Sequence, residues 1–217
     1  LNMSPVELED VLDRSDEGVD GVLSYVNRSN RILRDIVIPR LFKALYTVDE
    51  YKGEKKTLRK ALVKDPPDGD EGYEISVDPA LFADEGSAEY APFSEKSFHL
   101  SGYGFDSAPE LGFFRRNLPN EKIKNIWFTG MLTASQTDFF IHYIDPDTNA
   151  LRSYYPDFLI ELEDGGYLIA EIKGEHLLDA PVTKAKRRYA EEMALASTME
   201  YMLIPSAKAA ATSIGGP

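Results

Sequence analysis

The chain of 217 residues contains no cysteine. Disulfide bonds, thiolate nucleophiles and cysteine-ligated zinc sites are therefore excluded. Histidine is scarce as well, and no two histidines have the spacing of metal ligands on one helix, which argues against a histidine metal site. The three histidines are His99, His142 and His176.

Long apolar segments and targeting signals are also missing. No apolar run approaches the roughly 20 residues that a membrane-spanning helix needs. No signal-peptide pattern opens the chain, which starts with Leu1 rather than methionine. We therefore expect a cytoplasmic protein with no membrane partner, and the start at leucine favours a piece of a longer polypeptide.

Three widespread motifs of nucleotide-binding proteins and hydrolases do not occur in the chain. They are the phosphate loop G-x-x-x-x-G-K followed by Ser or Thr, the dinucleotide motif G-x-G-x-x-G and the nucleophile elbow G-x-S-x-G. ATP hydrolysis, dinucleotide binding and serine-hydrolase chemistry therefore lack their usual signatures here.

Positive charge is in deficit. The chain has 24 Lys and Arg against 37 Asp and Glu, a net charge of −13. Residues 1–100 carry 13 basic and 21 acidic side chains and residues 101–217 carry 11 and 16, so the two parts have net charges of −8 and −5. Such a balance disfavours a nucleic-acid partner at the level of the whole chain, although local basic groups remain. One basic stretch comprises Lys52, Lys55, Lys56, Arg59, Lys60 and Lys64.

The composition, 43% hydrophobic and 28% charged, is that of a globular protein with one or two domains. In residues 1–100, a capping-box spacing at Ser4–Glu7 and apolar residues at helical spacing between 19 and 46 predict helices with a break at Pro39. Residues 65–72 have the composition of a loop. We expect residues 1–100 to form a largely helical accessory region without a catalytic cluster.

Residues 101–217 predict a second domain of α/β (α+β) class. The expected fold is a mixed central sheet with an antiparallel meander, flanked by helices. The tail from Ala207 has small side chains and no clear pattern. The expected elements are a helix over 107–118, strands over 123–128, 137–144, 152–162 and 167–173, a helix over 182–198 and a strand over 201–204.

The segment 155–173 alternates between apolar and charged positions. Asp157, Glu161, Glu171 and Lys173 occupy odd positions. The even positions on either side of the turn are apolar: Phe158, Ile160, Leu162, Leu168, Ala170 and Ile172. Because successive side chains in a strand point to opposite faces, one face belongs to the core and the other carries the charges. A three-residue loop at 164–166 would pair 163 with 167 and bring Asp157, Glu171 and Lys173 onto one face. Glu161 lies nearer the turn and is interpreted as solvent-exposed.

Two carboxylates and an ammonium on one face are suited to a magnesium site. Mg²⁺ prefers oxygen ligands and is usually held by one or two carboxylates together with a substrate phosphate. A bound metal can polarise a phosphodiester and lower the pKa of its water. A lysine can position that water and offset the developing negative charge.

These residues also carry a family resemblance. Pro156-Asp157 followed by Glu171-Ile172-Lys173 resembles the PD-(D/E)XK nuclease motif. More narrowly, residues 105–205 resemble the C-terminal endonuclease region of type III restriction enzymes. That resemblance rests on Asp106-Ser107-x-x-Glu110-x-x-Phe113, on Tyr154-Tyr155-Pro156-Asp157-Phe158 and on Glu171-Ile172-Lys173-Gly174.

The resemblance implies a DNA endonuclease with a restriction-endonuclease-like core that depends on Mg²⁺, with Mn²⁺ as an alternative. Asp157, Glu171 and the carbonyl of Ile172 would hold the metal, and Lys173 would orient the attacking water. Glu110 would assist through a second metal or an outer-shell water. The implied partners are double-stranded DNA, an upstream superfamily 2 helicase motor on the same chain that uses ATP, and a modification methyltransferase.

Alternatives remain open for two groups of residues. Glu110 occupies the third position of a capping box begun by Ser107, so it is also expected to satisfy helix amides. The basic residues after the motif would either contact phosphates or form the solvated face of a helix. They are Lys184, Lys186, Arg187 and Arg188.

Two alternative functions also remain open. One is a repair or defence nuclease attached to a helicase, with the same chemistry in another role. The other is a non-catalytic domain of the same fold that binds DNA or partner subunits.

Overall fold

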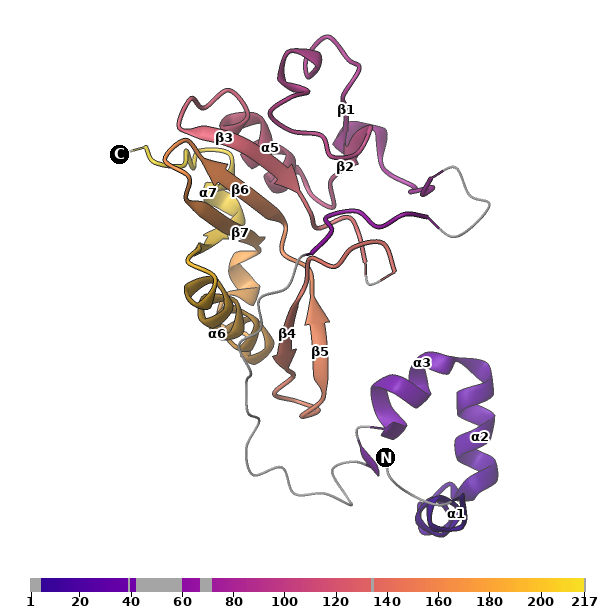
Figure 1. The fold of residues 1–217 in the computed structure, drawn as a ribbon. Helices are drawn as coiled ribbons and strands as arrows, with labels where there is room; N and C mark the ends of the chain where they lie inside the picture. The colour runs from indigo at the N-terminus through magenta and orange to yellow at the C-terminus, as the bar shows by residue number, and fades with distance from the viewer. Residues whose placement is uncertain (1–4, 39, 42–59, 67–71, 134, 217) are drawn as a thin grey trace. The chain divides into compact units, whose positions relative to one another are not determined.

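The computed structural model describes residues 5–38, 40–41, 60–66, 72–133 and 135–216 (Figure 1). The chain forms two compact units. The first unit comprises Leu1–Glu54 and Asp145–Ala150, and the second comprises Lys55–Ile144 and Leu151–Pro217. The division of the chain thus falls after Glu54, not near residue 100.

The first unit is helical, as its apolar periodicity predicts. It contains α1 (Pro5–Asp13), α2 (Gly18–Arg28) and α3 (Asn30–Ile32), and α3 continues into a π-helical turn, η1 (Leu33–Val37). Gly18 opens α2 with a φ of +62°, a conformation that glycine adopts without strain. Pro39, where a break is expected, and the part of the following helix expected between 42 and 46 lie outside the described residues. So do Lys52, Lys55, Lys56 and Arg59.

The described residues between 60 and 100 contain no α-helix, so the helical character expected of residues 1–100 as a whole does not extend over this part. They form the 3₁₀ turns η2 (Pro79–Leu81) and η3 (Ala91–Phe93) and strand β1 (Phe82–Asp84), which pairs antiparallel with β2 (Gly102–Gly104). Apolar side chains from this stretch are part of the core of the second unit. They include Ala83, Tyr90 and Phe98.

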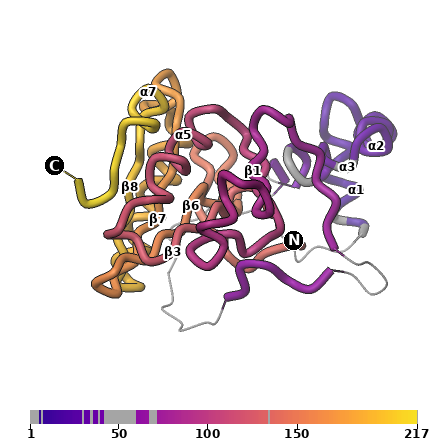
Figure 2. Tube along the Cα trace, turned by 90° about the horizontal axis from the view of Figure 1, so that it is seen from above, coloured from indigo at the N-terminus to yellow at the C-terminus, as the bar shows by residue number. Residues whose placement is uncertain are grey.

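A mixed sheet of four strands forms the centre of the second unit (Figures 1 and 2). Its order is β3-β6-β7-β8, with the first three strands antiparallel and β8 parallel to β7. This architecture confirms the expected mixed sheet flanked by helices. The strands are β3 (Ile123–Phe128), β6 (Phe158–Leu162), β7 (Tyr167–Lys173) and β8 (Glu200–Pro205), and the helices are α5 (Ala108–Asn117) before β3 and α6 (Pro181–Ala196) between β7 and β8.

The single strand expected over 152–162 is wrong. The structure has β5 (Leu151–Tyr154) and β6, separated by Tyr155-Pro156-Asp157, and the first of them leaves the central sheet. It pairs with β4 (Ile141–Ile144) as a separate hairpin, which extends away from the sheet in Figure 1. Pro156 provides the physical reason, because it has no N–H to donate to a strand partner.

Both faces of the β6–β7 pair are buried. Even-numbered residues such as Phe158 and Leu168 pack with Leu111 of α5, as the alternation predicts. The odd-numbered face carries the charged residues as expected, and Leu159 and Ile169 on the same face pack with residues of α6 and the β4–β5 hairpin. The helix α6 returns across this face, so Glu171 is buried and Asp157, across from it, is half-buried.

The C-terminal tail is part of the core rather than featureless. A short helix, α7 (Ser206–Ala209), lies beside α5 in Figure 2. Beyond it, Ile214 is 4% exposed, and its amide donates a hydrogen bond of 2.9 Å to the side-chain oxygen of Asn117. The amide group of that asparagine also donates to the carbonyl of Thr212 at 2.9 Å. These contacts join two segments almost a hundred residues apart in sequence.

We expect Ile214→Ala to lower the free energy of unfolding of the chain by about 2–4 kcal/mol, because it leaves a cavity where the tail enters the core. The matched variant Ile75→Ala removes the same atoms from a side chain that is 37% exposed, and should cost less than about 1 kcal/mol. Urea unfolding followed by circular dichroism measures both. Equal losses in the two variants would show that the tail does not stabilise the fold.

Within the described ranges, every helix is too short or too polar to cross a lipid bilayer.

Candidate active site

The turn between β6 and β7 is shifted by one residue toward the N-terminus from the expected position. The amide of Leu162 donates to the carbonyl of Gly166 at 2.8 Å, so the loop comprises residues 163–165 rather than 164–166. Gly165 takes the left-handed conformation, with a φ of +87°. The register Phe158↔Ala170 puts Asp157 across from Glu171, not from Lys173. The loop still has three residues, so the acids remain on one face.

Asp157 directly precedes β6, and its side chain is hydrogen-bonded to the main chain of β7. Its side-chain oxygen Oδ2 accepts a hydrogen bond of 2.7 Å from the amide of Ile172. Its own carbonyl accepts from the amides of Thr129 and Gly130 at 2.8 and 3.2 Å. A Cβ on Gly130 would lie 3.2 Å from Cα and 3.3 Å from Oδ1 of the aspartate, so only glycine allows this approach without displacement. Sequence reasoning missed both residues that follow β3.

Glu171 is buried with one oxygen unsatisfied. The residue is 4% exposed, and its Oε1 lies 3.1 Å from the ammonium of Lys173. Oε2 has no hydrogen-bond partner among the described residues. A buried carboxylate oxygen without a partner is costly for the fold, so this atom is an available ligand for a cation.

The electrostatics of the pair follow from burial. Burial, and then the negative charge of Glu171, raise the pKa of Asp157 well above its ordinary value. Burial also raises the pKa of Glu171, although the charge of Lys173 opposes this shift. For Lys173 itself, burial lowers the pKa, but the surrounding carboxylates more than offset it, so the pKa lies above the ordinary value. Without a bound cation, the two acids therefore resist ionising together.

Glu110 reaches the same place from α5 and has local partners too. Ser107 Oγ donates to its Oε1 at 2.8 Å, and the amide of Asp106 donates to Oε2 at 3.0 Å. The expected capping box does not form, because the side chain of Ser107 makes no hydrogen bond to a helix amide and Glu110 accepts from Asp106, one residue before the N-cap. Its charge also raises the pKa values of Asp157 and Lys173, so Glu110 lies near the pair.

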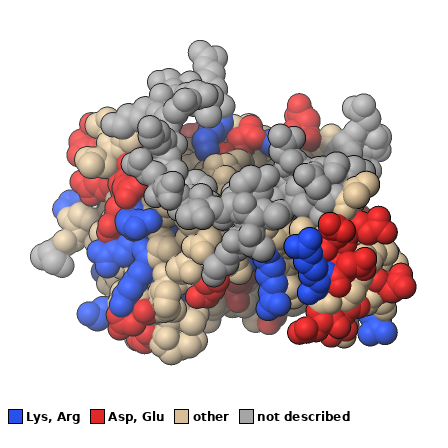
Figure 3. All heavy atoms as spheres, turned by 90° about the horizontal axis from the view of Figure 1, so that it is seen from below, with Lys and Arg blue, Asp and Glu red and all other residues tan. Residues whose placement is uncertain are grey.

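The four basic residues of α6 do not share one environment. Three are exposed and pair with carboxylates at the surface: Lys184 with Asp179 at 3.0 Å, Arg187 with Glu191 at 2.7 Å and Arg188 with Glu192 at 3.8 Å. On the face shown in Figure 3, groups of Lys and Arg side chains likewise lie beside groups of Asp and Glu. The fourth residue, Lys186, is half-buried, and its ammonium lies over the rings of Tyr143 and Tyr154.

Two tyrosines complete the surroundings of the acids. Tyr154, at the end of β5, is 3% exposed, and burial together with the charge of Glu171 raises its pKa. Tyr201 on β8 is half-buried, and its pKa is raised by the same two causes. Tyr154 belongs to the motif around Asp157 but was given no role in the site, and no sequence signal pointed to Tyr201, because β8 reaches the site only through the tertiary fold.

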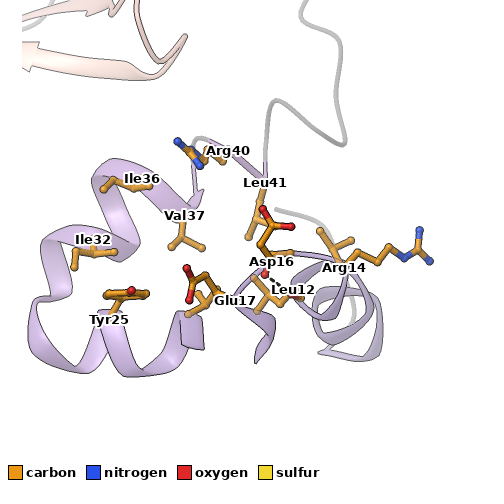
Figure 4. Close-up of a pocket in the computed structure, with 13 residues that line it drawn as sticks. Leu12, Arg14, Asp16, Glu17, Tyr25, Ile32, Ile36, Val37, Arg40 and Leu41 are labelled. Carbon is orange, nitrogen blue, oxygen red and sulfur yellow. Dashed lines mark hydrogen bonds between the residues drawn. The ribbon is translucent and has the colours of Figure 1, made fainter. Parts of the chain in front are cut away.

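Two cavities lie elsewhere in the molecule. One of about 640 Å³, shown in Figure 4, belongs to the first unit and combines apolar residues such as Leu12, Ile32 and Val37 with the charged residues Arg14 and Glu17. Another of about 330 Å³ in the second unit is lined by residues that include Lys122, Leu168 and Met202. Neither contains Asp157 or Glu171, so neither cavity is the site described above.

The candidate ligand set for a metal is small. Among the described residues, no group of three or more His, Asp and Glu side chains is arranged to hold an ion. Asp157 and Glu171 with one main-chain carbonyl make up a set of two carboxylates, which is the number that Mg²⁺ commonly takes from a protein. The unsatisfied oxygen of Glu171 and the repulsion between the two acids fit such a cation.

Comparison of the chain with protein-family models, with curated proteins and with solved structures gave no significant match. The function therefore has to be argued from the geometry and chemistry of the site.

Proposed function

We propose that the second unit is a Mg²⁺-dependent DNA endonuclease domain with a restriction-endonuclease-like core. The observation that carries this proposal is the meeting of Asp157, Glu171 and Lys173 at one end of the β6–β7 pair, with an unsatisfied buried oxygen on Glu171. The nuclease domain assigned to residues 101–217 then also needs residues 81–100, whose side chains complete its core.

The order of elements supports the same core. A helix carrying Glu110 precedes an antiparallel meander of β3, β6 and β7, and α6 then leads into a strand parallel to β7. The β4–β5 hairpin is an insertion within this order. It joins the meander directly before the Pro156-Asp157 pair.

A catalytic role explains the acids better than a scaffold role. A buried carboxylate, Glu171, beside a half-buried one, Asp157, reduces the stability of the fold, as their raised pKa values indicate. A domain that only binds partners would be more stable with apolar residues at these positions. A bound cation would turn the repulsion into an attraction, so the cost is consistent with a metal site.

The chain's own residues would act as follows. Asp157, Glu171 and the Ile172 carbonyl would hold Mg²⁺, which supplies charge stabilisation at the phosphate and an acidified water. The main-chain amide of Ile172 holds Asp157 in place. Lys173, fixed by Glu171, would orient the attacking water and stabilise the extra negative charge of the transition state.

In the hydrolysis itself, the water oxygen forms a bond to phosphorus and the bond from phosphorus to O3′ breaks. The water loses one proton to solvent, and the leaving O3′ gains one. The products are a 5′-phosphate and a 3′-hydroxyl.

We further propose that this domain is the cleavage part of a type III restriction enzyme. An upstream helicase motor on the same chain would use ATP, and a modification methyltransferase would be the partner subunit. This part of the proposal rests on the motifs around Glu110, Asp157 and Glu171.

The full 217-residue chain tests the nuclease proposal with supercoiled plasmid DNA. We expect nicked and linear products with Mg²⁺. No products should form when EDTA chelates the metal or when Glu171→Gln removes one ligand. Glu163→Gln, in the exposed turn of the same hairpin, is the matched control and should cleave like the parent. Metal-independent cleavage, or equal cleavage by the two variants, would refute the proposal.

A further inference from the structure

Lys186 is set apart from the other basic residues of α6 by the direction of its side chain. The three neighbours are exposed and pair along the surface of the helix or with the preceding loop. Lys186 instead lies on the side of α6 that covers the odd-numbered face of the sheet, where the acids are found.

The inserted hairpin supplies the aromatic rings that surround this lysine. Its ammonium is 5.5 Å from the ring centroid of Tyr143 on β4 and 5.3 Å from that of Tyr154 on β5. Both tyrosines are buried on the face of the hairpin that packs against α6. An ammonium over two aromatic faces is held by the ring quadrupoles, which do not cancel its formal charge.

The same ammonium lies near the carboxylate pair. Its positive charge lowers the pKa of Glu171, against the effect of burial. Glu171 therefore has two ammonium groups near it, Lys173 from β7 at 3.1 Å and Lys186 from α6. A site that must receive a phosphodiester anion beside two carboxylates needs cations in this position.

We propose that Lys186 is a second active-site lysine whose ammonium binds the phosphate to be cleaved, held in place by Tyr143 and Tyr154 of the β4–β5 hairpin. This inference rests on the proposed nuclease function and assigns a role to the insertion. The hairpin then acts as the wall that fixes the phosphate-binding lysine, and Lys184, Arg187 and Arg188 have at most peripheral contacts with DNA.

The test compares Lys186→Met with Lys184→Met and with Lys208→Met, a control at an exposed position on α7. Single-turnover plasmid cleavage with Mg²⁺ gives the rate. Binding of a short DNA duplex in Ca²⁺, followed by fluorescence anisotropy at several salt concentrations, gives affinity without relying on cleavage. Thermal unfolding confirms that each variant is folded.

We expect Lys186→Met to lower the cleavage rate by about 10²-fold or more, as for other groups that stabilise transition-state charge. Affinity for the duplex should fall about fivefold or more. The slope of log affinity against log salt concentration should become shallower by about one, which corresponds to the loss of one phosphate contact. Lys208→Met should match the parent. If Lys184→Met weakens rate and affinity as much as Lys186→Met, or if Lys186→Met matches the parent, the inference is overturned.

A second pair of variants keeps the lysine and changes its support. Tyr143→Leu removes a ring under the ammonium and should slow cleavage about tenfold, whereas Tyr143→Phe keeps the ring and should remain within about threefold of the parent. A parent that binds DNA without cleaving it would refute the nuclease proposal but leave the Lys186 assignment to the affinity measurements. A parent that neither binds nor cleaves would overturn both.

Discussion

Asp157→Asn should abolish Mg²⁺-dependent cleavage by the chain, with a loss of at least about 10³-fold in rate. The change removes one of two carboxylates that would hold the metal, and metal-based charge stabilisation contributes several kcal/mol to such reactions. Asparagine keeps an oxygen that can accept the hydrogen bond from the amide of Ile172, so the loss would not reflect a broken hairpin. Single-turnover cleavage of a plasmid measures the effect.

The same substitution should stabilise the metal-free fold at neutral pH. Because the pKa of Asp157 is raised in the folded state, the parent loses stability as the pH rises from its unfolded pKa through its folded pKa. The neutral amide avoids that loss, and we expect a gain of about 1–3 kcal/mol at pH 8. The gain should shrink as the pH falls and vanish below about 3, where the carboxyl group carries its proton in both states.

Mg²⁺ should reverse the order of stability. At a metal concentration 100-fold above its dissociation constant, the parent gains about 2.7 kcal/mol, whereas the variant gains little. Asp164→Asn, in the exposed turn of the hairpin, is the control and should behave like the parent in cleavage and in both stability measurements. Cleavage by Asp157→Asn within about tenfold of the parent would contradict the role of Asp157.

Lys173→Met should lower the cleavage rate by about 10²–10³-fold while leaving the metal bound. The proposed work of this ammonium is on the attacking water and on the charge of the transition state, not on the metal. Mg²⁺ should therefore still raise the unfolding temperature of the variant by as much as it raises that of the parent. Cleavage rates and thermal unfolding with and without Mg²⁺ measure the two effects.

Lys124→Met provides the matched control. Lys124 is also a strand lysine paired with a glutamate, Glu161, at 2.8 Å. Its side chain is more exposed than that of Lys173, and it pairs with neither Asp157 nor Glu171. Its loss should leave the cleavage rate within about twofold of the parent. A loss of the Mg²⁺-induced stabilisation in Lys173→Met would instead show that this lysine supports metal binding rather than the chemical step.

Strand parity made part of the site predictable. The alternation over 155–173 places Asp157 and Glu171 on the same face for any loop with an odd number of residues, so the error in the loop position changed the residue opposite Asp157 but not which residues share its face. Strands β3 and β7 also begin and end where their apolar patterns predict. Such patterns are local and depend on the backbone period alone.

Residues whose positions depend on nonlocal packing were not predictable in this way. Thr129 and Gly130 hold Asp157 through main-chain contacts, which leave no mark on the side-chain pattern. The burial of Ile214 depends on Asn117, a partner far away in sequence. Lys186 is one of four similar basic residues within five positions, and only the orientation of α6 against the hairpin distinguishes it.

The amino-acid sequence by itself determined the class of fold, the main strands and the pairing of two acids with a lysine, because alternation and turn residues act over a few neighbours. Only the tertiary structure decided that Glu171 is buried and Asp157 half-buried, since that requires α6 and the β4–β5 hairpin to cover the second face of the sheet. It also decided which lysine joins them. Burial and the orientation of a helix are set by the packing of whole elements, which no local pattern encodes.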